Sequence, residues 1–330
     1  MGTPYAPNIF KALEGVFCVY KPADFSIGRL LYHVRNNIVQ DLNKINVRPM
    51  RRKFFTDETK KDEDGLPMIL DVPDLADHTL VIGPRYTAED IDLKCITPLH
   101  KLSSGVTLLS CQNHSQLRKI QNRFNVRVHH VIGMLGTATN DFTVNGSIVE
   151  RSKFKHVDHN RIDRVLAGMQ AGHQRYMFQA CNVDPQSQEA YELAIKGLIR
   201  PTDPQAGPVV YGMKCTAFSP PYFTLEIHSV NETCIYLHKL VHELGLELRT
   251  NATTVKLRRS NYGRFTTNHA LLRKHWTPEN IVENINICKK CLEKDRDNEK
   301  LIKRIDVTDD NFLLEDEDEE EVHLLPTTNE

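Results

Sequence analysis

Short apolar runs alternate with amphipathic stretches along this chain, a pattern that indicates a mixed α/β protein. Apolar residues recur every three or four positions in four segments, and this spacing predicts helices over residues 27–45, 117–124, 159–169 and 234–245. Other segments are continuously apolar or alternate with polar residues, which predicts strands over residues 15–20, 105–110, 129–136, 209–218 and 223–227. Pro220-Pro221 is the predicted turn between the last two of these strands.

One loop has the features expected of a functional site. The segment from Pro98 to Ser110 turns at Ser104-Gly105 and continues as an apolar strand, so a side chain a few residues before the glycine is presented where the strand begins. That side chain is His100. From the residues alone, His100 is either a candidate catalyst or an ordinary hydrogen-bonded loop histidine.

Composition narrows the class of protein. The chain has 330 residues, of which 40% are hydrophobic and 26% charged, enough to bury one large core or two smaller ones. No apolar run has the length that a membrane span needs, so we expect no membrane association. Eight cysteines without a secretory signal predict reduced thiols. The pair Cys288-Lys-Lys-Cys291 has zinc-type spacing but lacks a second pair, and we expect two helix residues there.

Charge is distributed unevenly. The net charge is −1, but residues 315–321 carry seven acids, so the rest of the chain amounts to +6. A mildly basic body with an acidic tail suits a protein that binds a polyanion; the tail is equally consistent with a solvated segment that aids solubility. We predict three parts: an N-terminal extension (residues 1–14), a core (residues 15–290) and a charged, flexible tail (residues 291–330).

Several segments resemble, in the same order, the motifs of TruB-type pseudouridine synthases. Gly15 to Pro22 resembles the opening motif, a strand closed by Lys-Pro. The loop of His100 resembles the catalytic loop, which reads Leu-Asp-x-x-x-Ser/Thr-Gly. Gln188–Gly197 resembles the segment Ala-Tyr-Glu-x-Ala-x-x-Gly, and Val255–Phe265 resembles the late motif Leu-Arg-Arg-Ser/Thr-x-x-Gly-x-Phe. The middle segments are most similar to the mitochondrial messenger-RNA branch of this family in animals.

The resemblance implies a pseudouridine synthase fold: a bent, mostly antiparallel sheet flanked by helices, here without a counterpart of the C-terminal PUA domain. It also implies three site positions. The family aspartate aligns with His100, the tyrosine that stacks on the target base with His129, and the arginine that pairs with the aspartate with His238. All three positions therefore hold histidine in this chain.

These replacements bear on the chemistry. Family enzymes flip a uridine out of its stack and use the aspartate as nucleophile or base while the glycosidic bond is broken and remade. Imidazole can act as a base, but His238 near neutral pH is not the fixed cation that an arginine supplies. We therefore expect impaired catalysis, with no cofactor. The alternative is an active synthase with a rearranged site. Asp92 is a poor substitute, because it precedes the loop by several residues.

Two further possibilities follow from the same residues. If the fold brings His100, His129 and His238 together, three imidazoles form a possible zinc set; otherwise they are relaxed positions that still stack on bases. A third class of function is an interaction module whose acidic tail carries the activity.

Binding of RNA is the function that the resemblance and the charge pattern share. We expect phosphate contacts from a set of basic residues: Lys21, Lys101, Arg118, Arg123, Arg127, Arg258 and Arg259. Arg51 to Phe55 mixes basic and aromatic residues and is either a further RNA contact or a solvated loop. The resemblance implies the mitochondrial matrix, although residues 1–14 lack the arginines of a convincing presequence. The expected partners are mitochondrial RNA and proteins of RNA processing or ribosome assembly.

Overall fold

A computed structural model describes residues 5–48, 52–61, 67–121, 125–180, 183–195 and 207–308. Its strands are β1 (Gly15–Lys21), β2 (Arg52–Lys61), β3 (Pro67–Pro73), β4 (Leu93–Cys95), β5 (Ser104–Cys111), β6 (Arg127–Leu135), β7 (Thr137–Thr139), β8 (Ile148–Arg151), β9 (Val209–Ser219), β10 (Tyr222–Val230), β11 (Ala252–Tyr262) and β12 (Phe265–Thr266). Its helices are α1 (Ala6–Ala12), α2 (Ile27–Lys44), α3 (Thr79–Ile82), α4 (Leu117–Gln121), α5 (His159–Ala180), α6 (Gln188–Ile195), α7 (Cys234–Glu247) and α8 (Pro278–Thr308).

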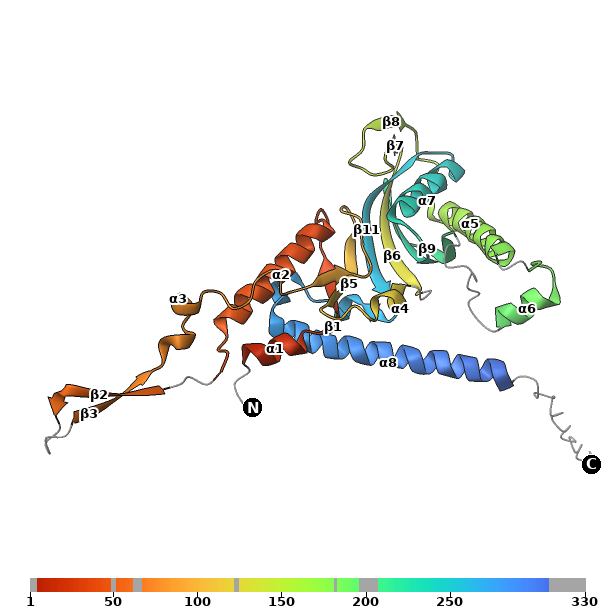
Figure 1. Cartoon of the computed structure of the whole chain (residues 1–330). Coiled ribbons are helices and arrows are strands. Elements are labelled where there is room, and N and C mark those ends of the chain that lie inside the picture. The colour runs from red at the N-terminus through yellow and green to blue at the C-terminus, as the bar shows by residue number, and fades with distance from the viewer. Residues whose placement is uncertain are drawn as a thin grey trace, which may run out of the picture. The chain divides into compact units, whose positions relative to one another are not determined.

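The central sheet runs in the order β1-β5-β11-β6-β10-β9, with β4 added to β5 and β12 to β11 (Figure 1). Neighbouring strands are antiparallel except for β5 and β11, which run parallel and pair at Ser104 with Arg258 and at Gly105 with Arg259. The prediction of an α/β fold with a mostly antiparallel sheet flanked by helices is confirmed. The one parallel pair places the start of β5 beside the middle of β11.

Two hydrophobic cores hold the helices against the sheet. One core combines strands β6, β9, β10 and β11 with α5 and α7, and buries Val131, Leu225, Leu240 and Leu257. The other combines β1, β4 and β5 with α1, α2 and the first turns of α8, and buries Phe17, Leu30 and Trp276. The two cores lie under opposite ends of the strand order, so both halves of the sheet are anchored.

Helix α2 shows how local sequence specifies an element. Its buried positions are Leu30, Val34, Ile38 and Leu42, one apolar stripe at helical spacing. The hydroxyl of Ser26 accepts a hydrogen bond from the backbone N–H of Arg29 at 3.2 Å and caps the first turn. The helix predicted over residues 27–45 is therefore confirmed, as is the turn at Pro220-Pro221 between β9 and β10.

One segment departs from the sequence-based expectation. The sequence pattern predicted no strand between residues 48 and 85, but β2 spans Arg52–Lys61 and pairs with β3. A two-stranded ribbon is held by its ladder of backbone hydrogen bonds and needs no periodic apolar face. Its sequence therefore lacks the alternation from which strands are predicted.

The chain divides into two units, residues 1–289 and residues 290–330. Both cysteines of the Cys288–Cys291 pair lie in α8, as predicted. The predicted tail begins inside this helix, which continues to Thr308, and the three-part division stays a prediction. Within the described residues, no helix combines the length and apolar character required to cross a bilayer.

Candidate functional site

A buried lysine, Lys21, holds the loop that presents His100. The side chain of Lys21 at the end of β1 is fully buried, and its ammonium donates to the backbone carbonyls of Pro22 (3.1 Å), Lys101 (3.0 Å) and Ser103 (2.5 Å). Burial lowers the pKa of Lys21 to about 8. His100 itself is exposed, on the outer side of this anchored loop.

Strand β11 supplies a second anchor. The guanidinium of Arg259 is buried and donates from Nη2 to the carbonyl of Thr97 at 2.8 Å and from Nε to the carbonyl of Val106 at 2.9 Å. Gly105 has φ of +123°, and a Cβ at this position would clash with the backbone of Arg259. Only a glycine therefore lets β5 approach β11 closely enough for Arg259 to hold the loop.

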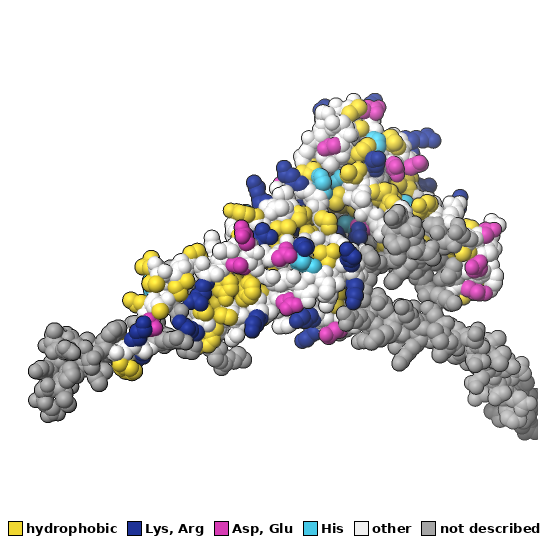
Figure 2. Space-filling model, viewed as in Figure 1, with side chains coloured by type: hydrophobic (Ala, Val, Ile, Leu, Met, Phe, Trp, Pro, Cys, Tyr) yellow, Lys and Arg dark blue, Asp and Glu magenta, His cyan; other side chains and the backbone are white. Residues whose placement is uncertain are grey.

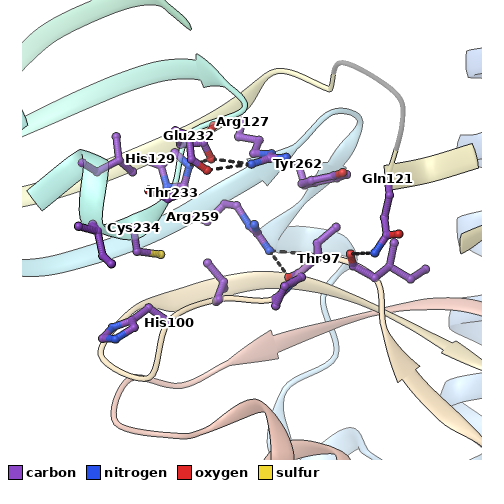
Figure 3. A pocket seen from close by; sticks show the side chains of 15 residues that line it. Thr97, His100, Gln121, Arg127, His129, Glu232, Thr233, Cys234, Arg259 and Tyr262 are labelled. Atoms are coloured by element: carbon purple, nitrogen blue, oxygen red, sulfur yellow. Dashed lines mark hydrogen bonds and ion pairs between the residues drawn. The ribbon is translucent and has the colours of Figure 1, made fainter. Parts of the chain in front are cut away.

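The His100 loop, strands β6 and β11 and the start of α7 line a cavity of about 560 Å³. Fifteen residues line it: Ile96, Thr97, Pro98, Leu99, His100, Gln121, Arg127, His129, Glu232, Thr233, Cys234, Ile235, Leu237, Arg259 and Tyr262. Figure 3 shows His100 and Cys234 at one end of the cavity, Tyr262 and Gln121 at the other, and Arg259 between them. A cavity of this size and mixed lining suits a small polar ring system.

A buried ion cluster forms one wall. Glu232 directly precedes Thr233, the N-cap residue of α7, and its Oε1 atom accepts from His129 Nε2 at 2.8 Å and from Arg127 Nη1 at 3.2 Å. Burial would raise the pKa of Glu232, but the hydrogen bond from His129 and the charge of Arg127 hold it at about 2. Burial lowers the pKa of His129 despite the carboxylate beside it. At neutral pH, Glu232 is therefore ionised and His129 is neutral.

His238 lies next to His100 but faces a different space. Their ring centroids are 6.5 Å apart in an edge-to-face arrangement, and His238 lines a second cavity of about 300 Å³ together with Leu102, Ser104 and Leu257. His238 is 5% exposed, and neither of its ring nitrogens has a hydrogen-bond partner. Burial lowers its pKa to about 4, and His100 adds to the effect.

The structure thus brings the three predicted histidines together only in pairs. His100 and His129 both line the larger cavity, and the ring of His100 lies beside that of His238, which lines the smaller cavity. Within the residues that the structure describes, no group of three His, Cys, Asp or Glu side chains is arranged to hold a metal ion. The zinc hypothesis therefore gains no support. Asp92 does not line the cavity; its carboxylate pairs with His114 at 2.8 Å.

The predicted RNA contacts differ in accessibility. Lys101, Arg118 and Arg258 are exposed, whereas Arg127 is half-buried in the ion cluster and Arg123 lies outside the described residues. Lys and Arg side chains are spread over the face seen in Figure 2, among apolar and acidic ones. Phe54 is exposed too, while Arg51 lies outside the described residues.

Two of the predicted contacts need correction. Lys21 and Arg259 are buried, and backbone carbonyls of the loop take up their charges. Neither residue is therefore positioned to contact a phosphate at the surface. Lys21 is an anchor of the loop, and Arg259 is an anchor that also forms part of the cavity wall.

Patterns in the sequence did not point to Glu232, Thr97 or Tyr262. Glu232 belongs to no motif, and its one local signal is its position just before a Thr that caps an apolar helix. Thr97 and Tyr262 reach the cavity through pairings between segments far apart in the chain. Local patterns do not contain that information.

With this geometry established, comparison with known proteins identifies the class. Residues 98–235, which begin at the His100 loop and include the ion cluster, match the N-terminal domain of TruB family pseudouridylate synthases. The chain belongs to this family.

Individual relatives cover most of the chain. The mitochondrial pseudouridylate synthase TRUB2 of Xenopus tropicalis is 38% identical over 293 residues, 86% of this chain and 88% of that protein. The human protein of the same name is 35% identical over 285 residues, 83% of each chain. Human pseudouridylate synthase TRUB1 is 23% identical over 280 residues, 84% of this chain and 69% of that protein.

Among solved structures, the archaeal box H/ACA sRNP Nop10-Cbf5 complex aligns with a TM-score of 0.45 and 11% identity, covering 83% of this chain and 60% of the matched chain. The complex of Cbf5, Nop10 and Gar1 aligns with a TM-score of 0.41, covering 83% of this chain and 58% of the matched chain. This chain therefore spans less than two thirds of those solved chains.

Proposed function

We propose that this chain is an RNA-binding member of the TruB family that does not carry out normal uridine isomerisation. One observation carries the proposal. The anchored loop that resembles the family's catalytic loop presents His100, and the one carboxylate among the described cavity residues is Glu232. The fold keeps the loop, and the loop holds no acid.

The chemistry of Glu232 makes it a weak replacement. Its Oε1 atom is engaged by Arg127 and His129, and its pKa is about 2. Basicity and nucleophilicity of a carboxylate fall as its pKa falls, so Glu232 is a poorer base than an ordinary aspartate. His129 is itself bound to Glu232, which restrains its ring from rotating to stack on a base.

The features needed for binding remain. The cavity is of suitable size, its loop is fixed by Lys21 and Arg259, and Lys101, Arg118 and Arg258 are exposed for phosphates. The names of the relatives, which include mitochondrial TRUB2, support a place in mitochondria, and we propose the matrix. The proposed role is in mitochondrial RNA processing or ribosome assembly.

The competing proposal is an active synthase with a rearranged site. Glu232 is the observation that favours it, because a carboxylate does line the cavity. In that case Glu232 or His100 would perform the step that the family assigns to aspartate. Both residues can be tested directly.

Pseudouridine formation on mitochondrial RNA separates the two proposals. We expect no product from the purified protein and product from the variant His100→Asp/His129→Tyr/His238→Arg, which returns the three family residues. Product from the unaltered protein that is lost in His100→Ala or Glu232→Gln would overturn the proposal and establish the active alternative. Circular dichroism of each variant controls for folding.

Charge reversal tests the RNA-binding part. Lys101→Glu/Arg258→Glu is expected to weaken RNA binding, because both side chains are exposed near the loop. Lys214→Glu is the matched control: Lys214 is also exposed but lies on β9, at the far edge of the sheet. Equal binding by all three proteins would contradict RNA binding beside the His100 loop and favour a function carried by the acidic tail.

A further inference from the structure

Side chains on a strand point alternately to the two faces of its sheet, and this alternation sorts the residues beside the site. The buried Lys21, Arg259 and His129 point to the face that carries the His100 loop and the larger cavity. Their neighbours in the chain point to the opposite face, which we call the outer face: Tyr20, Arg258 and His130. Arg258 is exposed there, and Tyr20 and His130 are half-buried.

Tyr20 and Arg258 are in contact on the outer face. Their strands both pair with β5, where Val106 lies opposite Tyr20 and Ser104 lies opposite Arg258. The guanidinium carbon of Arg258 is 5.7 Å from the centroid of the Tyr20 ring, the separation of a cation–π contact. The ring therefore restrains a guanidinium that would otherwise move freely at the surface.

Further cations lie beside this pair. Lys256, two residues before Arg258 on β11, points to the same face and is exposed. The segment that pairs with β1 on its side away from β5 continues into the exposed Arg273 and Lys274. This part of the surface is therefore suited to a polyanion.

An acid bounds the basic surface on the other side. Glu226 on β10 lies opposite His130, and its carboxylate accepts a hydrogen bond from His228 at 2.8 Å. This hydrogen bond, with the charges of His130 and Lys214, lowers the pKa of Glu226. An ionised carboxylate repels phosphates, so a polyanion is expected beside β1 and β11 and not across β10.

Cations beside an aromatic ring are the combination with which proteins bind single-stranded RNA. The cations contact phosphates, and an unstacked base stacks on the ring or on a guanidinium plane. The bases of a duplex are stacked on one another, so they do not reach a side chain on the face of a sheet.

We propose that the outer face binds a single-stranded segment of RNA, with one base stacked on the Tyr20–Arg258 pair and with Lys256 and the N–H groups of Arg258 on neighbouring phosphates. Tyr20 supplies the stacking surface and positions Arg258. This surface is on the face of the sheet opposite to the larger cavity, so it is an RNA contact separate from that cavity. The inference rests on the proposed RNA binding and narrows it to single strands at this face.

Binding of single-stranded and duplex RNA by the full chain tests the inference. A fluorescein-labelled strand of about 12 nucleotides without self-complementarity, and the same strand annealed to its complement, are titrated and followed by fluorescence anisotropy. We expect the single strand to bind at least about fivefold more tightly than the duplex. Tyr20→Leu removes the ring and is expected to weaken single-strand binding by about tenfold while leaving duplex binding unchanged.

Further variants separate stacking from charge and from loss of structure. Tyr20→Phe keeps the ring and should bind the single strand within about twofold of the unaltered protein. The matched control is Tyr191→Leu, at an exposed tyrosine on α6, which should bind as the unaltered protein does. Arg258→Gln is expected to weaken binding and to reduce its salt dependence by about one phosphate contact, whereas Tyr20→Leu keeps the salt dependence. Thermal melting establishes that each variant is folded.

The outcomes are distinct. Unchanged single-strand binding in Tyr20→Leu, or a loss that is equal for single strand and duplex, overturns the stacking assignment and leaves RNA binding standing. Binding of neither RNA overturns both proposals. If Tyr20→Leu does not fold, the unaltered protein still decides, because tighter binding of the duplex than of the single strand overturns the inference.

Discussion

His238 is buried as a neutral imidazole, at the position that the resemblance aligns with the family's arginine. His238 is 5% exposed, its nitrogens have no hydrogen-bond partner, and burial together with His100 lowers its pKa to about 4. Asp141 acts in the opposite direction but is outweighed. A charged side chain at this position would therefore need hydrogen-bond partners that the described residues around His238 do not provide.

Because His238 is buried and neutral, we expect the free energy of unfolding to depend on pH. As the pH falls below 6.5, the usual pKa of histidine, His238 takes up a proton in the unfolded chain. In the folded chain the His238 side chain stays neutral down to about pH 4. The free energy of unfolding should therefore fall by about 3 kcal/mol from this residue across that range and level off below it.

Urea unfolding between pH 7.5 and pH 4 measures the effect. His238→Leu should show a correspondingly shallower loss of stability on acidification than the unaltered protein, because it has no imidazole to protonate. The exposed His159, changed to Gln, is the matched control. Equal pH dependence in His238→Leu and the unaltered protein would mean that His238 is protonated in the folded state.

At the scale of elements, the His100 loop depends on one buried ammonium. Lys21 donates to three backbone carbonyls, in a buried hydrogen bond to Ser103 and partly buried ones to Pro22 and Lys101, and Lys21→Met would remove this donor from all three. We expect a loss of about 2 to 4 kcal/mol of stability and faster amide hydrogen exchange across residues 100–104. Lys44→Met, at an exposed residue that pairs only with Asp41, should change stability by less than about 0.5 kcal/mol. An unchanged exchange rate in Lys21→Met would show that the loop is held by other contacts.

The close pairing of β5 with β11 depends on Gly105. Gly105→Ala places a methyl group against the backbone of Arg259 at a positive φ, and we expect a loss of about 3 kcal/mol or more. Gly28→Ala provides the contrast, because α2 leaves open space there and alanine favours helix; a gain of up to about 1 kcal/mol is expected. Thermal melting of the two variants compares them, and a mild effect of Gly105→Ala would mean that β11 can shift.

These elements also show how far the sequence predicts the fold. α2 and the β9–β10 hairpin follow from spacing and turn residues that lie within each segment. The sequence of β2 has no apolar periodicity, and this strand was missed. The contact of Arg259 with Thr97 joins residues 162 positions apart through the parallel β5–β11 pair, and no local pattern encodes it. Motif order singled out His100 and His129, which line the larger cavity, and His238, which lines the smaller one; their role stays a prediction. The cluster around Glu232 was found only in the structure.

At the scale of the whole molecule, the distribution of charge bears on the proposed binding of RNA. The seven acids of residues 315–321 oppose a remainder of +6, so they reduce the attraction of the chain for a polyanion at low ionic strength. Over distances beyond about 10 Å, salt near 0.1 M screens such an effect. Any influence of these acids on RNA binding should therefore be largest in low salt.

Changing these seven residues to Gln and Asn raises the net charge from −1 to +6 at constant length. We expect tighter RNA binding at low salt and a steeper fall of affinity with salt concentration, because more counterions are released on binding. In a charge-preserving control, each Glu of the segment is changed to Asp and each Asp to Glu. This control should bind RNA as the unaltered chain does. Equal affinities at every salt concentration would assign the acids to solubility alone. Loss of RNA binding on neutralisation would instead place the function in the acidic segment, because a basic body that binds RNA by itself gains affinity when opposing charge is removed.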